Sequence, residues 1–191
     1  MAKLYFRYGA MNSGKTTALM QVAYNYKERG MRVLILKPSV DTKGQDCIVS
    51  RLGISCKVDV LVTPEMDVVE LVRTDAAEHG APACILCDES QFFTPEQAEQ
   101  LFRVTVDLSI PVICYGLRAD FMMRGFPGST RLLELAHTIE ELKTICACGR
   151  KAICNGRKVN GEFVFEGAQV AIDTVDDVQY QSLCPQCWYR E

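Results

Sequence analysis

The stretch that decides the fold runs from Lys3 to Thr16 and reads KLYFRYGAMNSGKT. Its first part, Lys3–Tyr8, alternates loosely between polar and apolar residues, which predicts a β-strand. The pattern G-x-x-x-x-G-K-[ST] follows over Gly9–Thr16, and Thr16–Arg29 then carries apolar residues at helical spacing without Pro or Gly. A strand, this glycine-rich pattern and a helix in that order predict a loop that binds the phosphates of a nucleotide.

The chemistry of such a loop rests on its main chain. Glycines let the backbone wrap tightly, so that successive N–H groups point at phosphate oxygens. The helix that follows adds the partial positive charge of its N-terminus. We expect Lys15 to reach the β- and γ-phosphates and the hydroxyl of Thr16 to bind Mg²⁺. The expected ATP-binding residues of this loop are Gly9, Ala10, Met11, Asn12, Ser13, Gly14, Lys15 and Thr16. A chance glycine-rich turn is the alternative, and the complete match disfavours it.

Outward from this loop, predicted strands and helices alternate. The expected strands are Val33–Leu36, Ala83–Cys87 and Ile110–Tyr115, and the expected helices are Pro64–His79, Pro95–Val106 and Leu132–Ala136. The polar residues 39–58 are expected to form mostly a mobile loop. This order favours an α/β fold with a parallel sheet flanked by helices.

The tail has a different character. From about Thr144 it is rich in Cys and Gly, with short β-like runs at Glu162–Phe165 and Gln169–Ile172. We therefore place a boundary near Lys143, which gives an α/β nucleotide-binding domain over 1–143 and a small domain over 144–191.

Two carboxylates end the apolar segment that begins at Ala83. In enzymes with such a phosphate loop, an Asp at the end of a neighbouring strand helps to hold Mg²⁺, and Asp88 suits that role. Glu89 is then free to act as a general base toward the attacking oxygen. The alternative is that Asp88-Glu89 only begins a solvated turn.

Four cysteines in the tail form two close pairs: Cys146 with Cys148, and Cys184 with Cys187. Four thiolates from two short turns fit the closed tetrahedral site of structural zinc. A catalytic zinc usually takes a His or carboxylate ligand, and the two histidines, His79 and His137, lie outside this segment. Disulfides or free thiols are the alternative, which an intracellular location disfavours.

Composition narrows the class of protein. The chain has 191 residues, of which 48% are hydrophobic and 24% charged, as in an ordinary globular domain. A net charge of −3 argues against a surface built for nucleic acid. No apolar run approaches the roughly 20 residues that span a bilayer, and the N-terminus lacks the pattern of a signal peptide. We expect a cytoplasmic protein with neither nucleic-acid nor membrane partners.

The motifs together resemble the cytosolic-type (type II) thymidine kinases over nearly the whole chain. Besides Gly9–Thr16 and the four tail cysteines, they include Asp88–Phe93, which reads DESQFF, and Tyr115–Phe121, which reads YGLRADF. These two stretches are far more specific than the phosphate loop alone. The resemblance implies a RecA-like P-loop sheet, a zinc-bound lasso domain, a homotetramer, and transfer of the γ-phosphoryl group of ATP to the 5′-hydroxyl of thymidine.

Individual roles follow from the same resemblance. It implies that Glu89 is the catalytic base and that Asp88 and Thr16 form the magnesium side. We also expect Asp88, Glu89, Ser90 and Gln91 to join the ATP-binding residues. The residues expected around the nucleoside are Met11, Phe92, Leu117, Phe121, Phe126 and Tyr180. Without the resemblance, core packing would be the preferred explanation for the three phenylalanines.

Some features leave alternatives open. Asp173–Val178 lacks the glycine pair that the family usually carries there, and Asp41-Thr42-Lys43 stands where many members have Asp-x-Arg. A kinase of another pyrimidine deoxynucleoside is therefore one alternative. A RecA-like, nucleic-acid-dependent ATPase with a zinc ribbon is another, although the negative charge and short chain disfavour it. A zinc-bearing interaction module with a degenerate nucleotide site is disfavoured because Lys15, Thr16 and Asp88 are intact.

Overall fold

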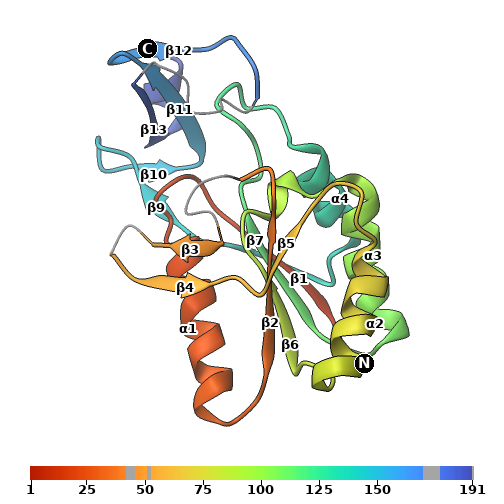
Figure 1. Cartoon of the computed structure of the whole chain (residues 1–191). Coiled ribbons are helices and arrows are strands. Elements are labelled where there is room, and N and C mark those ends of the chain that lie inside the picture. The colour runs from red at the N-terminus through yellow and green to blue at the C-terminus, as the bar shows by residue number, and fades with distance from the viewer. Residues whose placement is uncertain (42–45, 51–52, 170–176, 191) are drawn as a thin grey trace.

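A computed structural model describes residues 1–41, 46–50, 53–169 and 177–190 (Figure 1). Its centre is a sheet of six strands in the order β5-β2-β6-β7-β1-β8, and all neighbouring pairs are parallel. The strands are β1 (Leu4–Tyr8), β2 (Val33–Pro38), β5 (Val60–Val62), β6 (Cys84–Cys87), β7 (Val112–Gly116) and β8 (Thr138–Glu141). This arrangement confirms the predicted α/β fold with a parallel sheet.

Helices cover both faces of the sheet. They are α1 (Lys15–Glu28), α2 (Val68–His79), α3 (Pro95–Asp107) and α4 (Pro127–Leu135). Helix α1 packs on one face and the other three share a core on the opposite face. Strand β6 shows why its sequence is apolar throughout: Cys84 faces the core beneath α1, while Cys87 faces the other core. These two thiols therefore point to opposite faces of the sheet.

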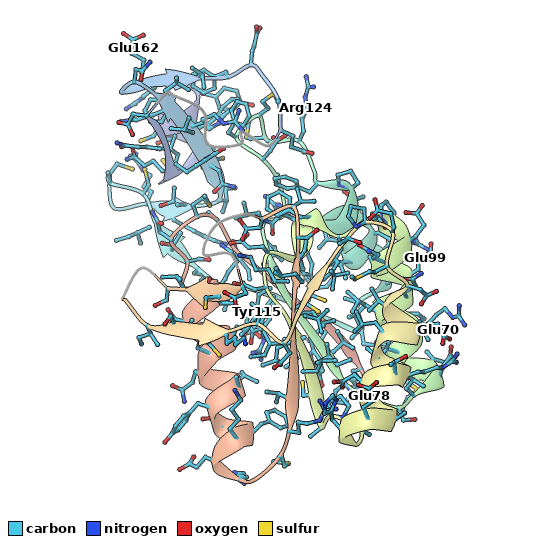
Figure 2. All side chains as sticks on the ribbon, in the orientation of Figure 1. Glu70, Glu78, Glu99, Tyr115, Arg124 and Glu162 are labelled. Atoms are coloured by element: carbon cyan, nitrogen blue, oxygen red, sulfur yellow. The ribbon has the colours of Figure 1, made fainter. Side chains whose placement is uncertain are left out.

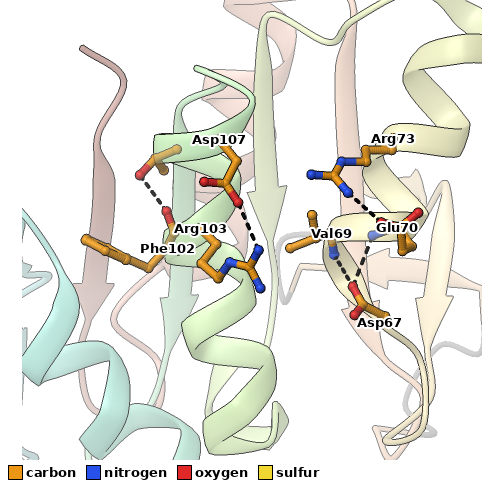
Figure 3. Close-up of polar contacts among 8 residues, drawn as sticks. Asp67, Val69, Glu70, Arg73, Phe102, Arg103 and Asp107 are labelled. Atoms are coloured by element: carbon orange, nitrogen blue, oxygen red, sulfur yellow. Dashed lines mark hydrogen bonds and ion pairs between the residues drawn. The ribbon is translucent and has the colours of Figure 1, made fainter.

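Local signals start the helices of the second face. The Asp67 carboxylate accepts hydrogen bonds from the N–H groups of Val69 and Glu70 and so caps α2 (Figure 3). Thr94 and Gln97 form a capping box at the start of α3, which also has a proline in its first turn.

Among the described residues, no helix combines the length and the apolar character needed to span a bilayer.

The segment 39–58, expected to be mostly a mobile loop, contains an antiparallel hairpin of β3 (Cys47–Val49) and β4 (Ser55–Lys57). Ile48 and Val58 are buried against the α1 side of the sheet. The burial of these two apolar side chains explains why this hairpin is ordered. Strands of three residues are too short for alternation to reveal them. Residues 42–45 and 51–52, which include Lys43 and Arg51, lie outside the described part of the chain.

Helix α4 begins at Pro127, earlier than the Leu132 expected from sequence. Proline suits the first turn of a helix because its missing N–H would have no partner there. Gly128 is also required: a Cβ at this position would lie 2.2 Å from the Phe93 carbonyl oxygen. The Pro-Gly pair that reads as a break in sequence is thus the close-packed start of a helix.

The C-terminal unit, residues 144–190, lies at one end of the sheet (Figure 1). It contains a β9–β10 pair, a three-stranded antiparallel sheet and a short helix. These elements are β9 (Thr144–Ile145), β10 (Lys151–Ala152), β11 (Cys154–Val159), β12 (Glu162–Val164), β13 (Val178–Leu183) and α5 (Pro185–Trp188). The expected run Glu162–Phe165 corresponds to β12, whereas residues 170–172 of the run Gln169–Ile172 lie outside the described residues. The domain boundary at 143/144 stays a prediction.

Candidate active site

The phosphate loop follows β1 directly and ends where α1 begins, as the motif requires. Gly9 has no room for a side chain, because a Cβ would lie 2.3 Å from the Ser13 Oγ and 2.5 Å from the Leu142 carbonyl oxygen. Asn12 and Gly14 have positive φ angles of 63° and 77°, so the backbone turns through left-handed conformations. The chain is thereby wrapped into the tight loop that can present N–H groups to an anion.

Lys15 lies within this loop. Its side chain is only 8% exposed, and its Nζ donates to the carbonyl oxygens of Gly9, at 3.3 Å, and Ala10, at 2.9 Å. A third contact joins Nζ to the Ser13 Oγ at 3.5 Å. The ammonium group is therefore held in the concave loop, where phosphate oxygens would be stronger acceptors than neutral carbonyls.

Asp88 and Glu89 follow β6, which lies two strands from β1 in the sheet. Asp88 is 4% exposed, and burial together with the neighbouring Glu89 carboxylate raises its pKa to about 7. Lys15 acts in the opposite direction and favours the ionised form of Asp88. A divalent cation would favour that form further, so this carboxylate is suited to a metal-assisted site.

Glu89 adopts a left-handed backbone conformation with φ 46° and ψ 40°, which is uncommon for a residue with a side chain. Its Oε2 accepts a hydrogen bond of 2.5 Å from the Nε2 of Gln91. The Oε1 of Gln91 in turn accepts the Leu117 N–H at 3.0 Å, and Gln91 is 2% exposed. One buried amide thus links the expected base to the segment that follows β7.

The expected nucleoside residues gather from separate elements. Phe92, in the 3₁₀ helix η1 (Ser90–Phe92), contacts Phe126 edge to face with ring centroids 5.7 Å apart. Leu117 is 8% exposed, and its carbonyl accepts the hydroxyl of Ser129 at 2.6 Å. Close packing of η1 against β7 depends on Gly116, where a Cβ would lie 2.6 Å from the Ser90 Oγ.

Arg157, which the sequence analysis missed, connects Phe121 with Tyr180. Its guanidinium lies 3.7 Å from the centroid of the Phe121 ring, and its Nε donates to the Tyr180 hydroxyl at 3.0 Å. The two terminal nitrogens donate to the carbonyl oxygens of Ala168, at 2.8 Å, and Gln169, at 2.9 Å. This buried residue in β11 therefore holds both expected nucleoside side chains beside the segment at 168–169.

The four tail cysteines converge as predicted: the sulfur atoms of Cys146, Cys148, Cys184 and Cys187 all lie within 4.8 Å of one another. Within the described ranges, no other set of three or more His, Cys, Asp or Glu side chains is placed to hold a metal ion. Two tight turns build the site. Gly149, with φ 83°, allows the first, and a hydrogen bond of 3.4 Å from the Cys187 N–H to the Cys184 sulfur shapes the second.

The electrostatics of the cluster favour a cation. Backbone N–H groups of Arg150 and Cys187 lower the pKa values of Cys148 and Cys184, respectively. Hydrogen bonds with the sulfurs of Cys148, Cys184 and Cys146 raise the pKa of Cys187 to about 12. A bound cation would favour the thiolate form of all four side chains, and a donor set of four sulfurs fits a closed zinc site. Cys154 is buried nearby but is not part of the cluster.

Comparison with known proteins identifies the family. The sequence model described as thymidine kinase matches residues 2–188. A thymidine kinase from Ruegeria pomeroyi is 46% identical over 190 residues, covering 98% of this chain and 94% of the relative. The thymidine kinase of Enterobacteria phage T4 is 44% identical and covers 98% of this chain and 96% of its own.

Among solved structures, AMPPCP-bound DnaA from Aquifex aeolicus aligns with a TM-score of 0.41 and 16% identity, over 73% of this chain and 40% of that one. A thymidine kinase from Chromobacterium violaceum matches 100% of both chains at 44% identity. With its family match spanning almost every residue and its full-length relatives near 45% identity, the chain belongs to the thymidine kinase family.

Proposed function

We propose that this protein transfers the γ-phosphoryl group of ATP to the 5′-hydroxyl of thymidine, which yields dTMP. The observation that carries the proposal is the family match over residues 2–188. This range includes the phosphate loop Gly9–Thr16 (the P-loop), the Asp88-Glu89 pair and the cysteine cluster. Phosphoryl transfer depends mainly on positioning and on stabilisation of charge. The chain offers groups suited to both tasks.

The P-loop is suited to hold the triphosphate. We infer that loop N–H groups and Lys15 bind the β- and γ-phosphates, with the ammonium group exchanging its carbonyl partners for phosphate oxygens. Thr16 and Asp88 would hold Mg²⁺. When bound, Mg²⁺ would neutralise negative charge on the triphosphate.

Glu89 is the proposed general base. Its carboxylate would accept the proton of the 5′-hydroxyl as the oxygen attacks the γ-phosphorus. The hydrogen bond from Gln91 limits the rotation of this carboxylate, because Gln91 is itself fixed by the Leu117 N–H. The roles assigned to Ser90 and Gln91 near ATP stay predictions.

The nucleoside would lie among Met11, Phe92, Leu117, Phe121, Phe126 and Tyr180. A pyrimidine has flat apolar faces, and aromatic, Leu and Met side chains bury such faces well. Arg157 supports this assignment because it holds Phe121 and Tyr180 together. Zinc at the cysteine cluster would reduce the entropy cost of ordering the adjoining segment on the nucleoside.

Several finer expectations stay predictions. Residues 173–176, where the family's glycine pair is replaced, lie outside the described residues. The preference for one pyrimidine deoxynucleoside over another is therefore tested by an assay with a panel of nucleosides. We also propose, on the resemblance, a homotetramer in the cytoplasm. Family membership argues against the alternative of a nucleic-acid-dependent ATPase.

The direct test offers γ-labelled ATP and Mg²⁺ with a panel of thymidine, deoxyuridine, deoxycytidine and purine deoxynucleosides. We expect labelled dTMP to form fastest. Transfer only to deoxycytidine would overturn the thymidine assignment. Release of labelled phosphate without any nucleotide product, or release stimulated only by DNA, would overturn the kinase assignment itself.

A further inference from the structure

A single buried side chain of the C-terminal unit contacts two expected binding segments at once. Asn155, in β11, is 5% exposed. Its Oδ1 accepts the Met11 N–H of the P-loop at 2.8 Å, and its Nδ2 donates to the Ala119 carbonyl oxygen at 2.9 Å. Met11 lies 144 residues away in sequence, so these bonds join distant parts of the chain.

We propose that Asn155 is a positioning residue that couples the P-loop to the segment 117–121, and through β11 to the cysteine cluster. This inference rests on the proposed function, since it assigns the P-loop to ATP and segment 117–121 to the nucleoside. It adds that the C-terminal unit sets the geometry of the ATP site as well as the nucleoside site. Asn155 acts on main-chain groups and takes no part in the chemistry.

The contact fixes the loop where its turn begins. The Met11 N–H is directed to Asn155, and the next residue, Asn12, has the left-handed φ of 63°. A second bond from the C-terminal unit supports the same turn, because the Thr144 hydroxyl donates to the Asn12 carbonyl oxygen at 3.3 Å. Loss of the Asn155 bond would leave this turn with the Thr144 contact and with the loop's own bonds, such as that from the Ser13 N–H to the Ala10 carbonyl oxygen at 3.3 Å.

The other end of the bridge controls the nucleoside segment. Ala119 is followed closely by Phe121, whose carbonyl oxygen accepts the Trp188 Nε1–H at 3.0 Å. Trp188 belongs to α5, the helix that contains the cluster ligand Cys187. Segment 117–121 is therefore tied to the C-terminal unit on two sides, by an amide from β11 and an indole from α5.

The amide group is required because one side chain must accept and donate at the same time. An aliphatic residue at 155 would take the Asn155 partner away from a partly buried N–H and a partly buried C=O, and leaving such groups unsatisfied costs free energy. An Asp could accept from Met11 but could not donate to Ala119. The placement thus explains why this position of a strand carries a buried amide.

The test compares Asn155→Ala with a matched control, Ser182→Ala. Ser182 pairs with Asn155 in the register of β11 and β13 and is also buried, but its hydroxyl donates to Ile145, within the C-terminal unit. Titration calorimetry measures the affinity of each zinc-loaded protein for a non-hydrolysable ATP analogue and for thymidine. We expect Asn155→Ala to weaken both affinities by about fivefold or more and Ser182→Ala to leave both within about twofold.

An unchanged affinity for the ATP analogue in folded Asn155→Ala would overturn the inference. If Asn155→Ala does not fold, chelation of zinc from the wild type replaces it: a fall in ATP-analogue affinity supports the coupling, and an unchanged affinity overturns it. Binding is measured without turnover. A wild type that binds both ligands but phosphorylates no nucleoside would therefore contradict the proposed function and leave the coupling intact.

Discussion

The α/β region and the C-terminal unit reach order by different means. Two apolar cores lie on the two faces of the parallel sheet, and they contain long aliphatic and aromatic side chains that are fully buried. The core of the C-terminal unit consists of Ala152, Leu183 and three cysteines, two of which belong to the sulfur cluster. Burial of apolar surface can stabilise the first region, whereas the second has a smaller apolar core, which a metal at the sulfur cluster and contacts with the first region would supplement.

The two regions also contribute differently to the site. The phosphate loop follows β1, the two carboxylates follow β6 and segment 117–121 follows β7, so the sheet sets the positions of the groups proposed to react. The C-terminal unit contributes Asn155, Arg157 and Trp188, which donate to or accept from main-chain groups around the site. On the proposed roles of these residues, the chemistry would reside in the α/β region and the C-terminal unit would complete the geometry.

Glu89→Gln is expected to separate most clearly the chemical role proposed for the α/β region from the positioning role proposed for the C-terminal unit. The amide keeps the size of the side chain but cannot accept the hydroxyl proton, so turnover should fall by about 10²–10⁴-fold. Thymidine affinity should stay within about threefold by calorimetry, because binding does not require the base. Glu162→Gln, an exposed carboxylate of the C-terminal unit in Figure 2, is the control and should keep full turnover. Loss of thymidine affinity with turnover preserved would contradict the assignment.

Loss of a cluster ligand should disrupt the C-terminal unit and spare the sheet. In Cys184→Ser we expect the zinc content to fall from about one ion per chain to near zero, since structural zinc needs all four ligands. Hydrogen exchange should then lose protection in β11 and β13 while the six-stranded sheet stays protected. Cys154→Ser alters a buried thiol outside the cluster and should keep its zinc. Full zinc occupancy in Cys184→Ser would refute the site.

A cavity in the core beside the sheet should destabilise the α/β region and spare the zinc site, which is the reverse of the effect expected from Cys184→Ser. Leu86 is fully buried in β6 beneath α1, and Leu86→Ala should lower the free energy of unfolding by about 2–5 kcal/mol. Denaturant unfolding followed by helical circular dichroism would measure this loss. Zinc content below the transition should match the wild type. A destabilisation under about 1 kcal/mol would mean that this core contributes less to stability than its burial indicates.

The smallest effect is expected at the start of α3, where the Thr94 hydroxyl accepts the Gln97 N–H of its own helix at 3.1 Å, although Thr94 follows the expected nucleoside residue Phe92 by two positions. Thr94→Ala removes half of the capping box of α3 and should cost about 1 kcal/mol in stability. Thr94→Ser should retain most of it because serine supplies the same hydroxyl. Neither change should alter zinc content or thymidine affinity. If Thr94→Ala changed ligand binding more than stability, the division between the two regions would need revision.

The sequence predicted those features that local patterns encode. The P-loop, the Asp88-Glu89 pair and the cysteine pairs are short motifs, and the structure places them at a strand–helix turn, at the end of a buried strand and in one cluster. The strands β5 and β8 were missed. Both lie at the edges of the sheet. β5 is apolar but has only three residues, and β8 reads TIEE and is mostly exposed.

Asn155 and Arg157 were missed for another reason. Polar residues in a strand usually face solvent, and nothing in the neighbouring residues of β11 indicates that these two point inward. Their burial depends on where the P-loop, Ala119 and Phe121 lie, which is known only after the chain has folded. Tertiary placement, and not local pattern, decides such residues.

The most direct test of the central claim is a crystal structure of the wild type with thymidine and a non-hydrolysable ATP analogue. The measured quantity is the distance from the Glu89 carboxylate to the 5′-oxygen of thymidine. We expect about 3 Å, with the 5′-oxygen in line with the terminal phosphate held by the P-loop. A Glu89 carboxylate turned away from the sugar, with another base at the 5′-oxygen, would contradict the account.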